Sequence, residues 1–126
     1  MDVFTYLLGK KAGKVLYSDA TGTNGDVTLS ESSANFKFIE IYYVTDEQYR
    51  SIKIYEPDGK KVQLIAQTLD VETPRIYGKT KCMVFDGASL SVVNFCQYAI
   101  NNNSMGYLQT ADNRNTIYIT NVIGYK

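Results

Sequence analysis

The sequence predicts an all-β fold, an antiparallel, jelly-roll-like β-sandwich preceded by a short N-terminal tail. Three observations lead to this fold class. The longest run of strand-favouring residues, Phe36–Val44, carries bulky apolar side chains at both parities, as expected for a central strand with a neighbour on each side. Turn signals recur about every ten residues, which is typical of sandwiches and barrels. Between the turns, β-branched and aromatic residues favour strands over helices.

The predicted sandwich domain spans residues 14–126, and residues 1–13 form a separate tail, helical or flexible. Four apolar residues of the tail lie at helical spacing: Val3, Phe4, Leu7 and Leu8. Because this stripe is too short for a stable isolated helix, the tail is either frayed or a plug that docks on the domain or on a neighbouring chain. The start lacks the basic region and apolar core of a signal peptide. We therefore expect synthesis in a cytoplasm, with release only by lysis.

In the first half of the domain the sequence predicts four strands: Lys14–Ser18, Asp26–Leu29, Phe36–Val44 and Tyr49–Glu56. Between the first two, Asn24-Gly25 is a strong turn signal. The polar segment Ser30–Asn35 is a loop that can hold one helical turn. In the fourth strand Ile52 and Ile54 share one face, which is the pattern of a half-buried strand.

In the second half the sequence predicts four more strands: Val62–Leu69, Arg75–Phe85, Ser89–Tyr98 and Thr116–Tyr125. The turn Pro57–Lys60 places proline and glycine where turn geometry needs them, so we expect residues 50–68 to form a hairpin. Asp86-Gly87 turns the next pair. In the third of these strands one parity carries Leu90, Val92, Asn94 and Cys96, and the other carries Val93 and Phe95. In the closing strand Ile117, Ile119 and Ile123 share a face.

The two cysteines, Cys82 and Cys96, flank the Asp86-Gly87 turn. If these two residues are the loop, Cys82 faces Ser91. Cys96 then faces Tyr77. Cysteines this far out of register do not reach the ~5.5 Å Cα spacing of a disulfide, so we expect free, mostly buried thiols.

The composition excludes most classes of catalytic and metal site. The chain has no histidine, which removes the commonest general base and the commonest metal ligand. The glycines lie one per turn, and none belongs to a phosphate-binding loop. Thirteen basic and thirteen acidic residues give a formal net charge of zero, with no long run of one sign that would attract nucleic acid or an anionic membrane. We expect a non-enzymatic protein with no cofactor, no metal, no nucleic-acid partner and no membrane association.

Paired carboxylates are the one catalytic device that the composition allows, as in glycoside hydrolysis. The pair would be Asp46 with Glu47, or Asp70 with Glu72. A calcium site at Asp70, Glu72 or Asp112 is also chemically allowed, because hard cations bind oxygen ligands. All of these residues lie in polar connections, where a solvated acidic loop is the simpler interpretation.

Eleven tyrosines in a chain without tryptophan leave two interpretations open. Tyrosine suits half-buried strands, because its ring packs while its hydroxyl stays in water. Alternatively, the tyrosines form a recognition surface, because they give contact area at a low entropic cost. For any single tyrosine the first interpretation is the simpler one.

Several segments resemble a family of bacteriophage virion domains, found in tail-tip, tail-fibre and baseplate-associated proteins of phages of low-GC Gram-positive hosts. Lys14–Ser18, Val27–Ser32 and Phe36–Tyr43 are similar to the start of these domains, and Ile117–Lys126 is similar to their close. The opening Phe4–Lys11 resembles a short leader on such proteins. The chain departs from the family in having Tyr17 where tryptophan is frequent, and Ser18-Asp19 in place of serine-glycine.

This resemblance implies a non-enzymatic structural protein displayed on the virion, as a β-sandwich that is often trimeric. Its implied partners are further copies of itself, with a trimer favoured, other virion proteins and a host-surface saccharide. It brings no catalytic residues with it. The alternatives are a small capsid or tail assembly adaptor that docks through residues 1–13, and a carbohydrate-active enzyme.

For saccharide contact we expect the long polar connection between residues 102 and 114. Tyr107 can stack on a sugar face, while four polar side chains can hydrogen-bond hydroxyl groups: Asn102, Asn103, Asp112 and Arg114. The simpler alternative is that this segment is only a solvated loop.

Overall fold

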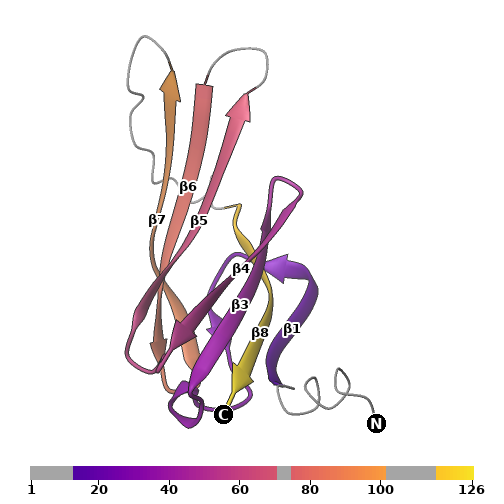
Figure 1. Cartoon of the computed structure of the whole chain (residues 1–126), viewed down its shortest axis with the longest axis vertical. Helices are drawn as coiled ribbons and strands as arrows, with labels where there is room; N and C mark the ends of the chain where they lie inside the picture. Colours follow the sequence, from indigo (N-terminus) through magenta and orange to yellow (C-terminus); the bar gives the residue numbers. More distant parts are fainter. Residues whose placement is uncertain (1–12, 71–74, 102–115) are drawn as a thin grey trace, which may run out of the picture.

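The computed structural model describes residues 13–70, 75–101 and 116–126, which form two four-stranded antiparallel sheets packed against each other (Figure 1). The predicted β-sandwich is confirmed. The prediction for the tail falls on residues 1–12 and lies outside the described residues. No helix in the described part of the chain has the length and apolarity needed to cross a bilayer.

The first sheet, sheet A, has the order β1-β8-β3-β4. Its strands are β1 (Lys14–Thr23), β8 (Tyr118–Tyr125), β3 (Phe38–Thr45) and β4 (Gln48–Tyr55). The longest apolar run becomes β3, which has β8 on one side and β4 on the other, as predicted for a central strand. The predicted helical turn is the 3-10 segment η1 (Ser33–Asn35).

The second sheet, sheet B, has the order β2-β7-β6-β5. Its strands are β2 (Val27–Thr28), β7 (Ser89–Asn101), β6 (Arg75–Asp86) and β5 (Lys61–Asp70). The first described strand therefore pairs with the last, and β2 pairs with β7, which are the two outer pairs of a nested, jelly-roll-like order. The pairs β3–β4, β5–β6 and β6–β7 are local hairpins.

The core lies between the two inner faces, where every second side chain of each strand points inward. β3 contributes Ile39, Ile41 and Tyr43, all at most 5% exposed. The opposite sheet and the remaining strands contribute further fully buried apolar side chains: Leu64, Met83, Phe85, Leu90, Ile119 and Val122. Burying each such side chain stabilises the fold by roughly 1.5–3 kcal/mol, so this alternation is the main driving force for the sandwich.

The predicted hairpin of residues 50–68 is wrong, because β4 and β5 belong to different sheets. β4 pairs with β3 through the two-residue turn Asp46-Glu47, and β5 pairs with β6. The segment Pro57–Lys60 is a turn, but it crosses from one sheet to the other. The Asp58 carboxylate accepts hydrogen bonds of 2.9 Å from the Gly87 amide and from the Ser33 hydroxyl, so the crossing is anchored to sheet B.

Two β-bulges overturn the predicted parities of β7 and β8. A register shift opposite Cys82 and Met83 leaves Val93 without a ladder partner, and the Asp26 carboxylate accepts a 2.8 Å hydrogen bond from the Val92 amide. A bulge adds one residue and so reverses the alternation beyond it. Phe95 is therefore buried, and Asn94 and Cys96 lie on the outer face.

A second shift, between Tyr42 and Tyr43, bulges β8 at Thr120. Ile119 and Val122 both point into the core, where each is 0% exposed. Ile123 pairs with Glu40 on the outer face, so it does not share a face with Ile119 as predicted.

The predicted register of the β6–β7 hairpin is also wrong, because Gly87 and Ala88 are the loop residues and Asp86 pairs with Ser89. Gly87 has φ +59°, as the first central residue of a type II′ turn requires. In this register Cys82 pairs with Asn94, and Cys96 pairs with Thr80. Both thiols are free, as predicted, but they are only partly buried.

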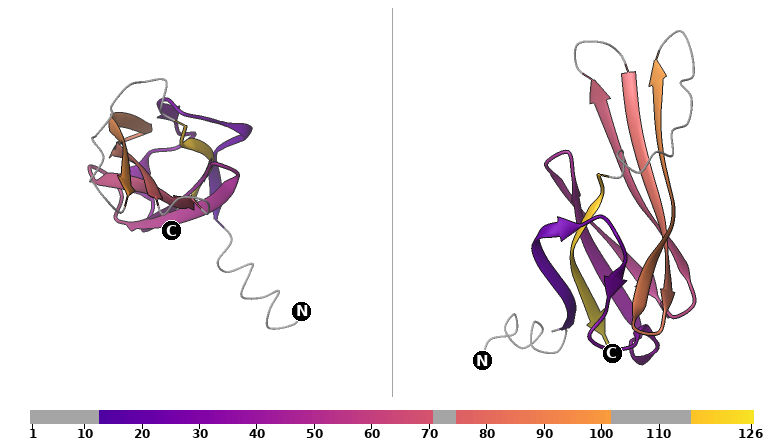
Figure 2. Two further views of the ribbon diagram at one scale, coloured as in Figure 1. Left: turned by 90° about the horizontal axis from the view of Figure 1, so that it is seen from above. Right: turned by 180° about the vertical axis from the view of Figure 1, so that it is seen from behind.

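The three strands of sheet B's hairpins rise well beyond the end of sheet A (Figures 1 and 2). We call this projection the arm; it consists of residues 66–70 of β5, 75–79 of β6 and 97–101 of β7. Sheet A reaches the base of the arm, where the Asp46 carboxylate contacts Lys79. Beyond that level no second layer of described residues covers either face of the arm.

Candidate functional site

The outer face of sheet A gathers aromatic side chains from three neighbouring strands. We call these residues the tyrosine face: Phe38, Tyr42, Tyr49, Tyr55, Tyr118 and Tyr125. They lie on the outer face because their parity is opposite to that of Ile39, Ile41 and Tyr43 in the core. The tyrosine face includes five of the eleven tyrosines of the chain.

The register sets the rings in rows across the sheet. Phe38 pairs with Tyr55 on one side and with Tyr125 on the other, and Val44 pairs with both Tyr49 and Tyr118. Aromatic side chains directly opposite each other on one sheet face stabilise the pairing by roughly 0.2–1 kcal/mol per pair. The rows therefore support the sheet and present aromatic surface at the same time.

Phe38 is the centre of a row of contacting rings. Its ring stacks on Tyr125 with centroids 4.6 Å apart and planes at 14°, and it meets Tyr55 at 5.4 Å and 41°. The Lys53 ammonium lies 4.8 Å from the Phe38 centroid, within the range of a cation–π contact. These contacts hold the rings in fixed positions, which lowers the entropy lost when a partner binds.

The outermost members of the tyrosine face are open to solvent. Tyr49 is 83% exposed and Tyr55 is 56% exposed, and both lie on the edge strand β4. Large apolar side chains this exposed are a candidate contact surface when they adjoin other aromatic residues. Glu40 and Lys53 pair across the strands on the same face, so charged and polar groups lie between the rings.

Tyr42 sits in the middle of the tyrosine face and hydrogen-bonds the Glu40 carboxylate. Desolvation by burial, followed by this hydrogen bond and the Glu40 charge, raises the pKa of Tyr42 to about 12. Desolvation and the same charge also raise the pKa of Tyr125. At neutral pH both phenols are therefore protonated and act as hydrogen-bond donors.

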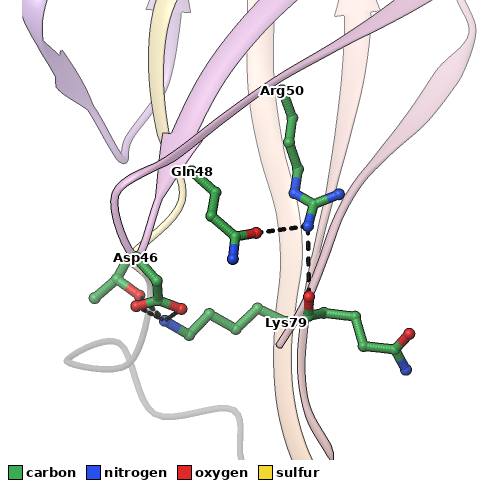
Figure 3. Close-up of polar contacts among 6 residues, drawn as sticks. Asp46, Gln48, Arg50 and Lys79 are labelled. Atoms are coloured by element: carbon green, nitrogen blue, oxygen red, sulfur yellow. Dashed lines mark hydrogen bonds and ion pairs between the residues drawn. The ribbon is translucent and has the colours of Figure 1, made fainter. Parts of the chain in front are cut away.

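A polar cluster joins the two sheets where they part, at the base of the arm (Figure 3). It consists of Asp46, Gln48, Arg50, Gln67, Lys79 and Thr116. The Lys79 ammonium lies 2.9 Å from the Asp46 carboxylate and donates a 2.7 Å hydrogen bond to the Thr116 hydroxyl. The Arg50 guanidinium donates to the Gln48 side chain at 2.7 Å and to the Gln67 carbonyl at 3.4 Å.

The turn that carries Asp46 is strained. Asp46 and Glu47 have φ values of +48° and +63°, and both central residues of a type I′ turn must be left-handed, a role that suits asparagine and glycine. The ion pair with Lys79 holds Asp46 in this conformation. Two buried polar atoms nearby, Thr45 Oγ1 and Arg50 Nε, have no hydrogen-bond partner among the described residues.

The polar cluster does not have the arrangement of a paired-carboxylate active site. Asp46 is neutralised by Lys79, and Glu47 is exposed at the tip of the turn. In such a site the two carboxyl groups face each other across the substrate. The cluster instead fixes the position of the β3–β4 turn against sheet B.

Lys81 is a buried cation that sequence reasoning missed. Its side chain is fully buried in the core, and its ammonium donates hydrogen bonds to the Asn24 carbonyl at 2.7 Å and to the Ile117 carbonyl at 2.6 Å. No carboxylate of the described residues forms an ion pair with it. Burial lowers its pKa from 10.5 to about 8. The available signal was its parity, which matches that of Met83 and Phe85.

The residues predicted to bind saccharide lie outside the described residues: Asn102, Asn103, Tyr107, Asp112 and Arg114. The same holds for Glu72 of the second carboxylate pair, while Asp70 ends β5. Their contribution to a site stays a prediction. Within the described ranges no group of three His, Cys, Asp or Glu side chains could hold a metal ion.

Comparisons with known proteins add no family to this picture. No protein-family model matches the chain, and no curated protein matches it.

Proposed function

We propose that this chain is a non-enzymatic structural protein of a bacteriophage virion that binds a host-surface saccharide through the tyrosine face of sheet A. The single observation that carries the proposal is the gathering of six aromatic side chains on one outer sheet face, two of them more than half exposed. The virion setting is supported by the resemblance of both ends of the chain to phage virion domains.

The chemistry of the tyrosine face suits a sugar ligand. A sugar ring offers an apolar face bordered by hydroxyl groups, which requires aromatic surface next to hydrogen-bonding groups. Tyr49 offers an open ring, and Glu40, Lys53 and Asn121 lie on the same face as the rings. The Tyr42 oxygen adds an acceptor, because its one O–H is donated to Glu40. The side chains stand on strands, so their positions are more exact than those of loop residues.

Display on a virion would add avidity to a weak site. Several copies that bind one cell surface together exceed the affinity of a single copy without any new contact. A weak, open sugar site on a repeated structural protein is therefore sufficient for attachment. The connection of residues 102–114 stays a second predicted contact with the same ligand.

Two experiments test this function. Mass spectrometry of purified phage particles should detect the chain; its absence from particles that contain the other structural proteins would contradict the virion setting. The fluorescently labelled protein should bind purified cell walls of the host bacterium, and Tyr49→Ala and Tyr55→Ala should each weaken binding about tenfold, or 1.4 kcal/mol.

Gln63→Ala is the matched control, because Gln63 is exposed on the outer face of sheet B. It should leave cell-wall binding unchanged. Binding that survives both tyrosine substitutions would exclude the tyrosine face as the saccharide site.

A further inference from the structure

The outer face of sheet B is almost free of charge. Most of it consists of five residues from each of β5, β6 and β7, which the register places in five rows across the sheet. The rows are Lys61–Val84–Ser91, Gln63–Cys82–Asn94, Ile65–Thr80–Cys96, Gln67–Gly78–Tyr98 and Leu69–Ile76–Ile100. The chain is 21% charged, so about three of fifteen positions should carry a charge. Among these fifteen only Lys61 does. The adjoining row at the β6–β7 turn, Asp86–Ser89, adds the carboxylate of Asp86, so both charges lie at the end farthest from the arm.

The same face exposes large apolar side chains. Ile65 is 51% exposed and Leu69 is 66% exposed, and Ile100 and the bulged Val93 are exposed beside them. A contiguous uncharged patch of this kind on a soluble domain marks a contact surface more often than a free one.

Tyr98 flattens this face at the base of the arm. Gly78 lies opposite Tyr98 in the register, and a Cβ at Gly78 would collide with two ring carbons and the hydroxyl oxygen of Tyr98. The ring therefore lies along the sheet above the glycine backbone. It covers Gly78, which is buried, and presents an aromatic surface in the row between those of Leu69 and Thr80.

A partner cannot add a strand beside the middle of β5, although β5 is an edge strand. The Tyr43 hydroxyl donates a 2.8 Å hydrogen bond to the Ile65 carbonyl, and Arg50 donates to the Gln67 carbonyl at 3.4 Å. These side chains occupy the carbonyl groups with which an added strand would pair. The remaining mode of contact is packing against the face of the sheet.

We propose that the outer face of sheet B packs against the same face of a second copy, forming a two-fold dimer. An isologous interface brings each surface against itself, and a face whose two charges, Lys61 and Asp86, lie at one end avoids like charges at its centre. The second copy covers this side of the arm, where the described residues provide no second layer. Two sheets pack face to face as a pair, so the proposal is a two-fold dimer, and the expected trimer is an outcome that the test distinguishes from it.

The size of the face sets the expected strength of the dimer. Fifteen residues a side fall below the roughly 20–30 residues of a stable interface, so association should be concentration-dependent, with a Kd of about 10 μM. The inference extends the proposed function by naming the surface that joins copies. It is tested on the pure protein without a ligand, so its failure is distinct from a failure of saccharide binding.

The test is sedimentation analysis of the full chain from about 1 to 100 μM, a range that brackets the expected Kd. The wild-type protein should shift from monomer to dimer over this range. Ile65→Lys and Leu69→Lys should each raise the Kd at least tenfold, because they place two like charges in the interface. Both side chains are more than half exposed, and far-ultraviolet circular dichroism checks that each variant retains the fold.

Val15→Lys is the matched control. Val15 is an exposed apolar residue, 54% exposed, on β1 of sheet A, so its substitution should leave the dimer intact. A protein that stays monomeric at 100 μM, a trimer, a dimer insensitive to both lysine substitutions, or a dimer broken only by Val15→Lys would each overturn the proposal.

Discussion

The two outer faces of this sandwich are made by the same alternation and yet differ in kind. Sheet A presents tyrosine rings with Glu40 and Lys53 between them, whereas sheet B presents isoleucine, leucine and amide side chains, with Lys61 and Asp86 at one end. The rings of sheet A hold one another in place. Two faces that served only as solvent boundary would not need to differ in this way, and this difference is the basis for proposing ligand contact for one and self-contact for the other.

The largest expected effect on stability concerns Lys81, which is buried on the inner side of sheet B. Its folded-state pKa of about 8 is below the ordinary 10.5, so between these pH values the unfolded state binds more protons and stability rises with pH. The free energy of unfolding should increase by roughly 2–3 kcal/mol between pH 7 and 10 relative to Lys81→Met. Urea denaturation of both proteins across this range measures the difference.

Tyr42 of sheet A should give stability the opposite dependence on pH, in a higher pH range. The pKa of Tyr42 is raised from 10 to about 12, so the unfolded phenol ionises first and stability falls as pH rises from 10 to 12.

For Lys81, the contradicting outcome lies in the lower pH range. If the stability of Lys81→Met ran parallel to that of the wild-type protein from pH 7 to 10, a titrating buried lysine would be excluded.

A smaller expected effect compares directly how much the two outer faces contribute to stability. Phe38→Ala removes the ring between Tyr55, Tyr125 and Lys53, and we expect a loss of about 2 kcal/mol. Ile65→Ala, on the exposed face of sheet B, should change the stability of the monomer by less than about 0.5 kcal/mol. Urea denaturation at low micromolar protein compares them, and equal losses would mean that the rings of sheet A are not mutually supported.

The sequence predicted the class of fold well because alternation is a local property. It identified β3 as a central strand, the helical turn at Ser33 and the free thiols. It failed at the crossing Pro57–Lys60, because a proline-glycine turn looks the same whether it joins two strands of one sheet or passes between sheets. It also failed beyond the bulges at Val93 and Thr120, because an added residue reverses the faces without leaving a sequence signal.

The candidate sites were harder to predict than the fold. The sequence raised a tyrosine recognition surface as one interpretation, but only the register brings Phe38, Tyr55 and Tyr125 into one row. The uncharged face of sheet B needs the pairing of β5, β6 and β7 together, with the parity change at Val93. Lys81 was overlooked because a lysine is expected at the surface.

The smallest expected effect is at the strained turn where sheet A ends and sheet B continues. Glu47 has φ +63°, which glycine adopts without steric cost. Glu47→Gly should raise the free energy of unfolding by about 0.5–1 kcal/mol, whereas Glu47→Ala should give no gain because the strain is kept. Thermal denaturation of both variants measures the change, and a gain with alanine would show that the glutamate charge, not the backbone, is unfavourable there.

The most direct test of the central claim is oxidative footprinting of side chains at about 1 and 100 μM protein, on either side of the expected Kd. If sheet B's outer face joins copies and sheet A's stays open, then Ile65, Leu69 and Tyr98 should become protected at the higher concentration, while Tyr49 and Tyr55 stay fully reactive. Protection of Tyr49 and Tyr55 with no change at Ile65 and Leu69 would contradict the assignment of the two faces.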